Sequence, residues 1–196
     1  MPKYCGVNHL AMVTGDMDST IRFWRDLLGL RLVAGLGHPG YRHYFFEISP
    51  TDLLAFFEWP EAKPLPMRDH GYPVAGPIGF DHVSIGVETE TDLWEVKDLL
   101  AAAGYDPSEV IHHGFIKSVY AFDPNGIPIE FSFSVPGADP RHTPAMADSA
   151  PSRICLEGPD PQPGHWPKPT PTPPSQRRDY PGEGKDVLEE DRNKWK

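Results

Sequence analysis

Two histidines and two glutamates recur at matching intervals along the chain. His9 lies 49 residues before Glu58, and His82 lies 48 residues before Glu130. Each histidine stands in a short strand-like run, and each glutamate lies in a later one, so the pattern predicts two copies of one unit. Imidazole and carboxylate groups at matching places in two such units are typical ligands of a divalent metal.

The residue types indicate which metals such a site takes. His9, His82 and Glu130 make the set of two imidazoles and one carboxylate that suits Fe(II), whereas Glu58 as a fourth ligand suits Zn, Ni, Co or Mn. Glu130 stands in an apolar run, where a carboxylate is costly to bury unless a positive group pairs with it. A metal is one such partner and Lys117 is another. Two histidines at matching positions favour ligands over isolated structural histidines.

The elements that must position these residues come in the same order twice. In the first unit we expect a strand at 7–13, a helix at 18–28 and further strands at 42–48 and 53–59. In the second unit we expect a strand at 81–87, a helix at 92–103 and further strands at 115–122 and 127–133. The tetrapeptide Asp-Pro-Asn-Gly at 123–126 predicts a tight turn between the last two strands.

The predicted fold is therefore α+β. Two βαβββ repeats, at about 5–60 and 78–135, form a cupped mixed sheet around the metal site in one domain, 1–135. Residues 136–196 carry 13 of the 24 prolines and predict an extended or disordered C-terminal arm. If the arm is ordered instead, Trp166, Tyr180 and Trp195 are the side chains that would anchor it on the core or on a partner subunit.

Composition excludes several classes of partner. The net charge of −10 and the pI of about 5.3 argue against nucleic acid, whose phosphates need clustered Lys and Arg. No apolar run approaches the roughly 18 residues of a membrane-spanning helix. The start of the chain has no apolar signal-like run, and Cys5 and Cys155 are far apart, so we expect a cytoplasmic protein with free thiols.

One stretch of the second unit carries a resemblance to a known family. It begins at His113, continues through Lys117-Ser118-Val119-Tyr120 and the turn at 123–126, and ends at Glu130. With the paired units, it resembles the vicinal oxygen chelate superfamily, which includes glyoxalases, bleomycin resistance proteins and extradiol dioxygenases. The resemblance covers about residues 5–135. It implies that His9, His82 and Glu130 bind the metal, that a small-molecule substrate chelates it, and that the protein is a homodimer. The family forms such sites either within one chain or across the dimer, and both arrangements stay open here.

Within that superfamily the stretch is similar to the extradiol dioxygenase signature. The resemblance gives Tyr120 and His113 the catalytic task of hydrogen bonding to a catechol oxygen. If the turn is 124–126, Tyr120 pairs across from Glu130 and shares its face. Extradiol enzymes carry a catalytic histidine in the strand that here ends at Glu58, and His43 and His70 are the candidates to replace it. Glyoxalase-like members place a further ligand or a catalytic base where Glu58 stands.

Three functions follow, in order of preference. The first is a ring-cleaving, extradiol-type dioxygenase that uses Fe(II) on an aromatic diol, because the tyrosine-containing signature is complete. The second is a glyoxalase- or epimerase-like lyase or isomerase that uses Zn, Ni, Co or Mn on an α-hydroxy-carbonyl substrate, because each unit has a glutamate. The third is a non-catalytic protein that binds a small molecule as bleomycin resistance proteins do.

Overall fold

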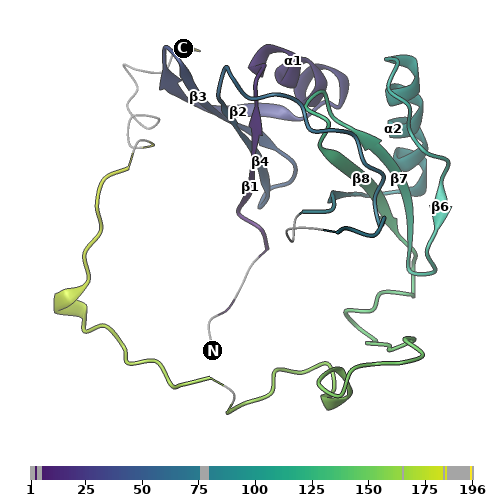
Figure 1. The fold of residues 1–196 in the computed structure, drawn as a ribbon, viewed down its shortest axis with the longest axis vertical. Coiled ribbons are helices and arrows are strands. Elements are labelled where there is room, and N and C mark those ends of the chain that lie inside the picture. The colour runs from purple at the N-terminus through teal and green to yellow at the C-terminus, as the bar shows by residue number, and fades with distance from the viewer. Residues whose placement is uncertain are drawn as a thin grey trace.

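The computed structural model describes residues 3, 6–75, 80–164, 166–182, 184 and 195. Two four-stranded sheets stand side by side, and each has a helix packed on one of its faces (Figure 1). A long C-terminal segment leaves the second sheet and runs in an open arc away from both (Figure 1).

The two sheets have the same topology. The first contains β1 (His9–Thr14), β2 (Arg31–His38), β3 (Tyr41–Glu47) and β4 (Leu53–Glu58), in the spatial order β1-β4-β3-β2. The second contains β5 (Val83–Val87), β6 (Ile111–His112), β7 (Ile116–Phe122) and β8 (Pro128–Ser134), in the order β5-β8-β7-β6. The first and last strands of each repeat pair in parallel, and the other pairs are antiparallel. The predicted pair of βαβββ repeats is confirmed.

Each helix begins at a capping side chain. Asp16 accepts a hydrogen bond from the Ser19 N–H at the start of α1 (Met17–Ile21), which continues as the π-helical stretch η1 (Arg22–Leu27). Thr89 and Asp92 form a capping box at the start of α2 (Glu90–Ala102), two residues before the predicted start.

One hydrophobic core joins the two repeats. Its buried members come from both sheets and both helical segments: Met17, Phe23, Trp24, Phe46, Leu54, Phe56, Ile85, Leu93, Leu100, Val119, Ala121, Ile127, Ile129 and Phe131. Because these side chains form a single cluster, the helix-covered faces of the two sheets share one interior. The opposite faces of the sheets lie outside this core.

A buried polar network also links the repeats. Thr14 at the end of β1 donates to the amide oxygen of Asn125, at 2.6 Å, and the amide nitrogen of Asn125 donates to Thr20, at 3.2 Å. Asn125 belongs to the predicted turn, which Asp123 closes by accepting from the N–H groups of Asn125 and Ile127. The turn therefore also holds the second repeat against the first through hydrogen bonds.

The C-terminal arm lies outside this core. It contains two short 3-10 turns, η2 (Cys155–Glu157) and η3 (Pro174–Gln176), and its aromatic residues Trp166 and Tyr180 are 88% and 86% exposed. These two side chains therefore do not anchor the arm on the core. Cys155 is exposed and free, whereas Cys5 lies outside the described residues. In the described part of the chain, no helix is long and apolar enough to span a membrane.

Candidate functional site

The strand register decides which residues of the two repeats correspond. Ala11 and Ser84 each lie two residues after the histidine of their repeat, and they pair with Ala55 and Glu130, respectively. Ala55 is therefore the counterpart of Glu130. The two spacings of 49 and 48 residues differ by one, and a shift of one residue moves a side chain to the other face of a sheet.

Glu58 accordingly lies on the face opposite His9. One of its carboxylate oxygens accepts from the Met17 N–H at the start of α1, at 2.9 Å, and the other pairs with Arg42, at 2.7 Å. The structure thus gives Glu58 two partners on the helix-covered side of the first sheet. It does not bring Glu58 together with His9.

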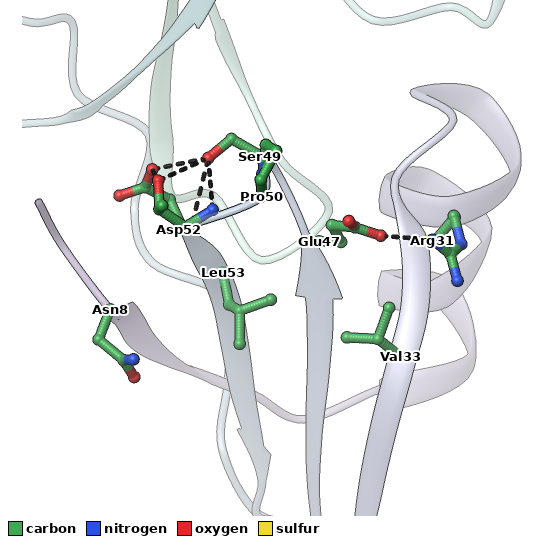
Figure 2. Close-up of a pocket in the computed structure, with 9 residues that line it drawn as sticks. Asn8, Arg31, Val33, Glu47, Ser49, Pro50, Asp52 and Leu53 are labelled. Carbon is green, nitrogen blue, oxygen red and sulfur yellow. Dashed lines mark hydrogen bonds and ion pairs between the residues drawn. The ribbon is translucent and has the colours of Figure 1, made fainter.

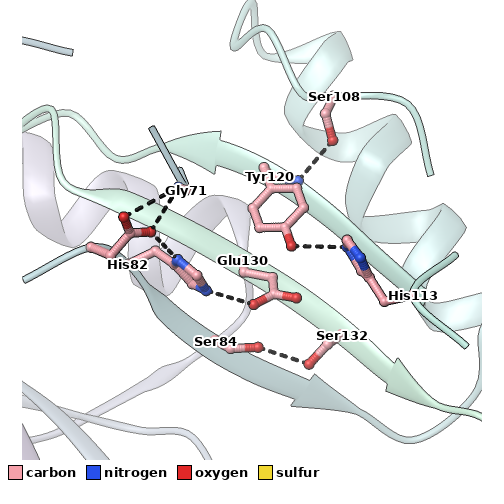
Figure 3. A network of polar contacts seen from close by, with 9 residues as sticks. Gly71, His82, Ser84, Ser108, His113, Tyr120, Glu130 and Ser132 are labelled. Carbon is pink, nitrogen blue, oxygen red and sulfur yellow. Dashed lines mark hydrogen bonds and ion pairs between the residues drawn. The ribbon is translucent and has the colours of Figure 1, made fainter. Parts of the chain in front are cut away.

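His82 and Glu130 are in direct contact on the open face of the second sheet (Figure 3). The imidazole Nε2 of His82 lies 2.9 Å from Oε2 of Glu130, whose side chain is only 4% exposed. The other oxygen, Oε1, is buried and has no hydrogen-bond partner among the described residues. Lys117, the alternative partner for this carboxylate, pairs with Glu90 instead.

A second carboxylate orients the His82 ring. Asp81 lies 2.6 Å from Nδ1 of His82, and this hydrogen bond is the main cause that lowers the pKa of Asp81 below its usual value. A neutral imidazole carries one N–H and can donate to only one of the two flanking carboxylates. A cation at Nε2, either a proton or a metal ion, would satisfy both contacts.

Tyr120 lies across from Glu130 on β7, as the predicted turn requires. Its hydroxyl is 3.1 Å from Nε2 of His113, and its ring meets the His82 ring edge-on at 5.7 Å (Figure 3). Burial, followed by the charge of Glu130, raises the pKa of Tyr120 above its usual value of 10. The phenol therefore keeps its proton at neutral pH and remains a hydrogen-bond donor.

His9 lies on the exposed face of β1, in the first sheet, where its ring meets Phe45 edge-on. The structure does not bring it to His82 and Glu130. Across the residues described, no group of three or more His, Cys, Asp or Glu side chains is close enough to hold a metal ion. Two of the three predicted ligands are thus together, and the third is on the other repeat.

Both histidines are oriented by the residue that precedes them, which the sequence reasoning missed. Asn8 lies 2.9 Å from Nδ1 of His9, just as Asp81 holds Nδ1 of His82. In both repeats Nε2 is therefore the nitrogen turned away from the neighbouring side chain. Metal-binding histidines commonly have such a second hydrogen bond. The adjacent pairs Asn8-His9 and Asp81-His82 were the available signal.

The open face of the first sheet is aromatic rather than polar. The His43 and Phe57 rings stack at 3.6 Å, and Phe57 is followed by Tyr41 at 6.2 Å and Trp59 at 6.5 Å. The open face also carries Phe45, whereas the aromatic side chains of Trp24, Phe46 and Phe56 lie in the core. This floor suits a flat, apolar molecule.

A shallow hollow lies at one end of the first sheet, around the β3–β4 turn (Figure 2). Its charged side chains are engaged with neighbours: Arg31 pairs with Glu47 at 2.9 Å, and Asp52 accepts from Ser49 and Thr51. None of the residues predicted to do chemistry lines it. It is therefore separate from the His82–Glu130 site.

Comparison with known proteins agrees with the two-repeat fold. The chain is 25% identical over 132 residues to a lactoylglutathione lyase from Haemophilus influenzae, a match that covers 63% of this chain and 88% of the lyase. Among solved structures, it is similar to a glyoxylase/bleomycin resistance protein/dioxygenase domain from Frankia, with a TM-score of 0.57 and 21% identity over 71% of this chain and 98% of that one.

A second similar structure is the fosfomycin resistance protein FosX from Listeria monocytogenes. It aligns with a TM-score of 0.51 and 14% identity over 68% of this chain and 96% of that chain, a likeness of fold alone. The model of one protein family matches residues 6–131, which include both repeats. The chain therefore belongs to the glyoxalase/bleomycin resistance protein/dioxygenase superfamily.

Proposed function

We propose that this protein is a metal-dependent oxygenase of the extradiol type, acting on an aromatic diol. The observation that carries the proposal is the buried Glu130 carboxylate, which contacts Nε2 of His82 and leaves Oε1 without a hydrogen-bond partner among the described residues. A buried carboxylate in that state is costly unless a cation joins it.

The three donors fit a divalent metal in their chemistry, and two of them, His82 and Glu130, are already in contact. His82 and Glu130 would hold it from the second repeat, with Nδ1 of His82 fixed by Asp81. His9, whose Nδ1 is held by Asn8, would be the third donor, from the first repeat. When bound, Fe(II) would supply the Lewis acid and the one-electron chemistry that O₂ requires.

The chain's own residues would orient the substrate and control its protons. Tyr120 keeps its phenolic proton and can donate a hydrogen bond to a substrate oxygen. His113, whose Nε2 lies 3.1 Å from the Tyr120 hydroxyl, can exchange a proton with that hydroxyl.

The number of carboxylates favours the oxygenase over a lyase. The lyase hypothesis needs a second glutamate at the site, and the strand register gives that position to Ala55 while Glu58 pairs with Arg42 on the other face. Two imidazoles and one carboxylate are the donor set of Fe(II) oxygenases. A lyase acting on a glutathione adduct is the second candidate, because the curated relative is a lactoylglutathione lyase.

Parallel assays separate the two candidates. The Fe(II)-reconstituted protein is mixed with catechol and substituted catechols while oxygen uptake is recorded. The Ni(II)- or Zn(II)-reconstituted protein is mixed with the hemithioacetal of methylglyoxal and glutathione. The oxygenase proposal expects uptake with catechols, reduced about 10²–10⁴-fold in Tyr120→Phe if this group acts as a general acid or hydrogen-bond donor.

Tyr105→Phe is the matched control for that variant. The pKa of Tyr105 is also raised by burial, but its ring packs against Phe23 in the core and not at the site. Turnover of the hemithioacetal without oxygen uptake would replace the oxygenase with the lyase. If a ligand binds but neither assay shows turnover, the remaining hypothesis is a non-catalytic protein that binds a small molecule.

A further inference from the structure

His70 lies over the candidate site although it belongs to neither repeat. It comes from the long connection between β4 and β5. Its imidazole stacks flat on the Tyr120 ring, with the ring centroids 3.3 Å apart and the planes 3° from parallel. It also meets the His82 ring edge-on at 6.1 Å. One face of Tyr120 is therefore covered by a planar side chain.

The backbone beside His70 is fastened to the site itself. The Gly71 N–H donates to the Asp81 carboxylate, at 3.2 Å (Figure 3). Arg68 lies 3.8 Å from the same carboxylate. Asp81 is the same carboxylate that orients His82. Gly71 has a φ of +69°, which only glycine adopts at little cost, so the connection can turn back at this point.

The His70 ring is held more weakly than its backbone. In the part of the chain that is described, the ring contacts are the stack on Tyr120 and the edge contact with His82, with no hydrogen bond or ion pair at the imidazole. A ring pair of this kind is worth a factor of roughly 2 to 10 in an equilibrium constant. A ligand ring that stacks on Tyr120 and bonds to its hydroxyl as well can replace it.

We propose that His70 is a gate residue: its imidazole occupies the face of Tyr120 on which a planar aromatic substrate stacks, and the substrate must displace it to enter. The gate rests on the proposed function, because it requires an aromatic ring beside Tyr120. It assigns His70 to substrate entry and selection rather than to metal binding. A molecule without a flat ring cannot replace the stacking contact between His70 and Tyr120, so it would bind more weakly than an aromatic one.

The test uses two substitutions at one position. His70→Ala removes the covering ring, and His70→Phe keeps a flat ring over Tyr120. His142→Ala is the matched control, since His142 is an exposed histidine of the C-terminal arm. Binding of 4-nitrocatechol is followed by its absorbance in the full-length protein reconstituted with Zn(II), which is redox-inactive and prevents turnover.

The gate predicts that His70→Ala binds the probe about 2- to 10-fold more tightly and associates faster. In His70→Phe and His142→Ala, affinity and association rate should not rise above wild type. Zinc content should be the same in all four proteins.

Four results would overturn the gate. Equal affinity and association rate in wild type and His70→Ala would remove it and leave the proposed function standing. Weaker binding in His70→Ala, restored in His70→Phe, would mean that the His70 ring contacts the bound probe and contributes to its affinity. Loss of zinc in His70→Ala would make His70 a ligand. No binding by any variant would overturn both the gate and the proposed function.

Hydrogen exchange of the wild-type protein gives a readout that does not depend on a substitution. If the probe displaces only the His70 ring and the Gly71 N–H stays bonded to Asp81, the amides around residues 68–72 should exchange no more slowly when 4-nitrocatechol is bound. Slower exchange in that segment would mean that the connection closes over the ligand, which contradicts displacement.

Discussion

Glu58 and Glu130 carry the same charge in very different surroundings. Glu130 is buried on the open face of its sheet and touches an imidazole, whereas Glu58 is on the helix-covered face and accepts from a helix N-terminus and an arginine. A spacing that differs by one residue accounts for this difference, because side chains alternate along a strand. Whether a glutamate of these strands can reach the metal site therefore depends on which face of the sheet its position gives it, and not only on its being a glutamate.

Glu58 should contribute to folding rather than to metal binding. Glu58→Ala leaves the Met17 N–H without its acceptor and Arg42 without its partner. We expect the free energy of unfolding to fall by about 1–2 kcal/mol, the usual cost of losing a capping carboxylate. Urea denaturation measures it, and Glu58→Gln, which keeps an acceptor oxygen, should lose less. An unchanged midpoint in Glu58→Ala would contradict the structural assignment.

At the scale of the elements, the sequence was most informative where one turn sets a register. The Asp-Pro-Asn-Gly sequence at 123–126 predicts a tight turn, and a turn at that place puts Tyr120 opposite Glu130. The structure has this pairing. β2 was not predicted, because Gly35 and Gly37 weaken its strand pattern and a bulge interrupts its pairing. The position of His70 could not be predicted, since it depends on how a long irregular connection folds back.

The turn should also contribute to the stability of the whole core. Asn125→Ala leaves the buried hydroxyls of Thr14 and Thr20 without their amide partner. We expect a loss of about 2–3 kcal/mol, the penalty for buried groups left unsatisfied. Urea denaturation compares it with Asn8→Ala, an exposed asparagine, which should change stability by no more than about 0.5 kcal/mol. Equal effects of the two substitutions would mean that the network does not join the repeats.

Asp123 in the same turn should make stability depend on pH. Burial is the main cause that raises its pKa above the usual value of 3.8. The folded state therefore binds a proton more tightly than the unfolded state does. The contribution of this group to stability is present below pH 3.8 and is lost as pH rises through the raised pKa.

Unfolding curves of wild type and Asp123→Asn across the acid range check this. The difference in stability between the two proteins should change in the direction that disfavours wild type as pH rises. The neutral amide has no charge to bury, so the variant should lack this part of the pH dependence. If the difference in unfolding free energy between wild type and Asp123→Asn stays constant with pH, the pKa of Asp123 is not raised in the folded state.

At the scale of the molecule, the folded unit consists of the two repeats and their shared core. The arm beyond residue 138 is almost wholly exposed in its described part and leaves the second sheet in an open arc (Figure 1). We expect removal of residues 139–196 to shift the thermal midpoint by only a few degrees and to leave metal content unchanged. Loss of folding or of metal after truncation would show that the arm completes the core or the site.

The metal content of the purified protein is the most direct test of a metal centre at His82 and Glu130. The protein is purified anaerobically, reconstituted with Fe(II), and analysed by mass spectrometry beside Glu130→Gln and Glu58→Gln. A metal centre at His82 and Glu130 predicts close to one metal per chain in wild type and Glu58→Gln and a large loss in Glu130→Gln, with all three proteins folded. An equal metal content in wild type and Glu130→Gln, or no metal in wild type after reconstitution, would contradict a metal centre at His82 and Glu130.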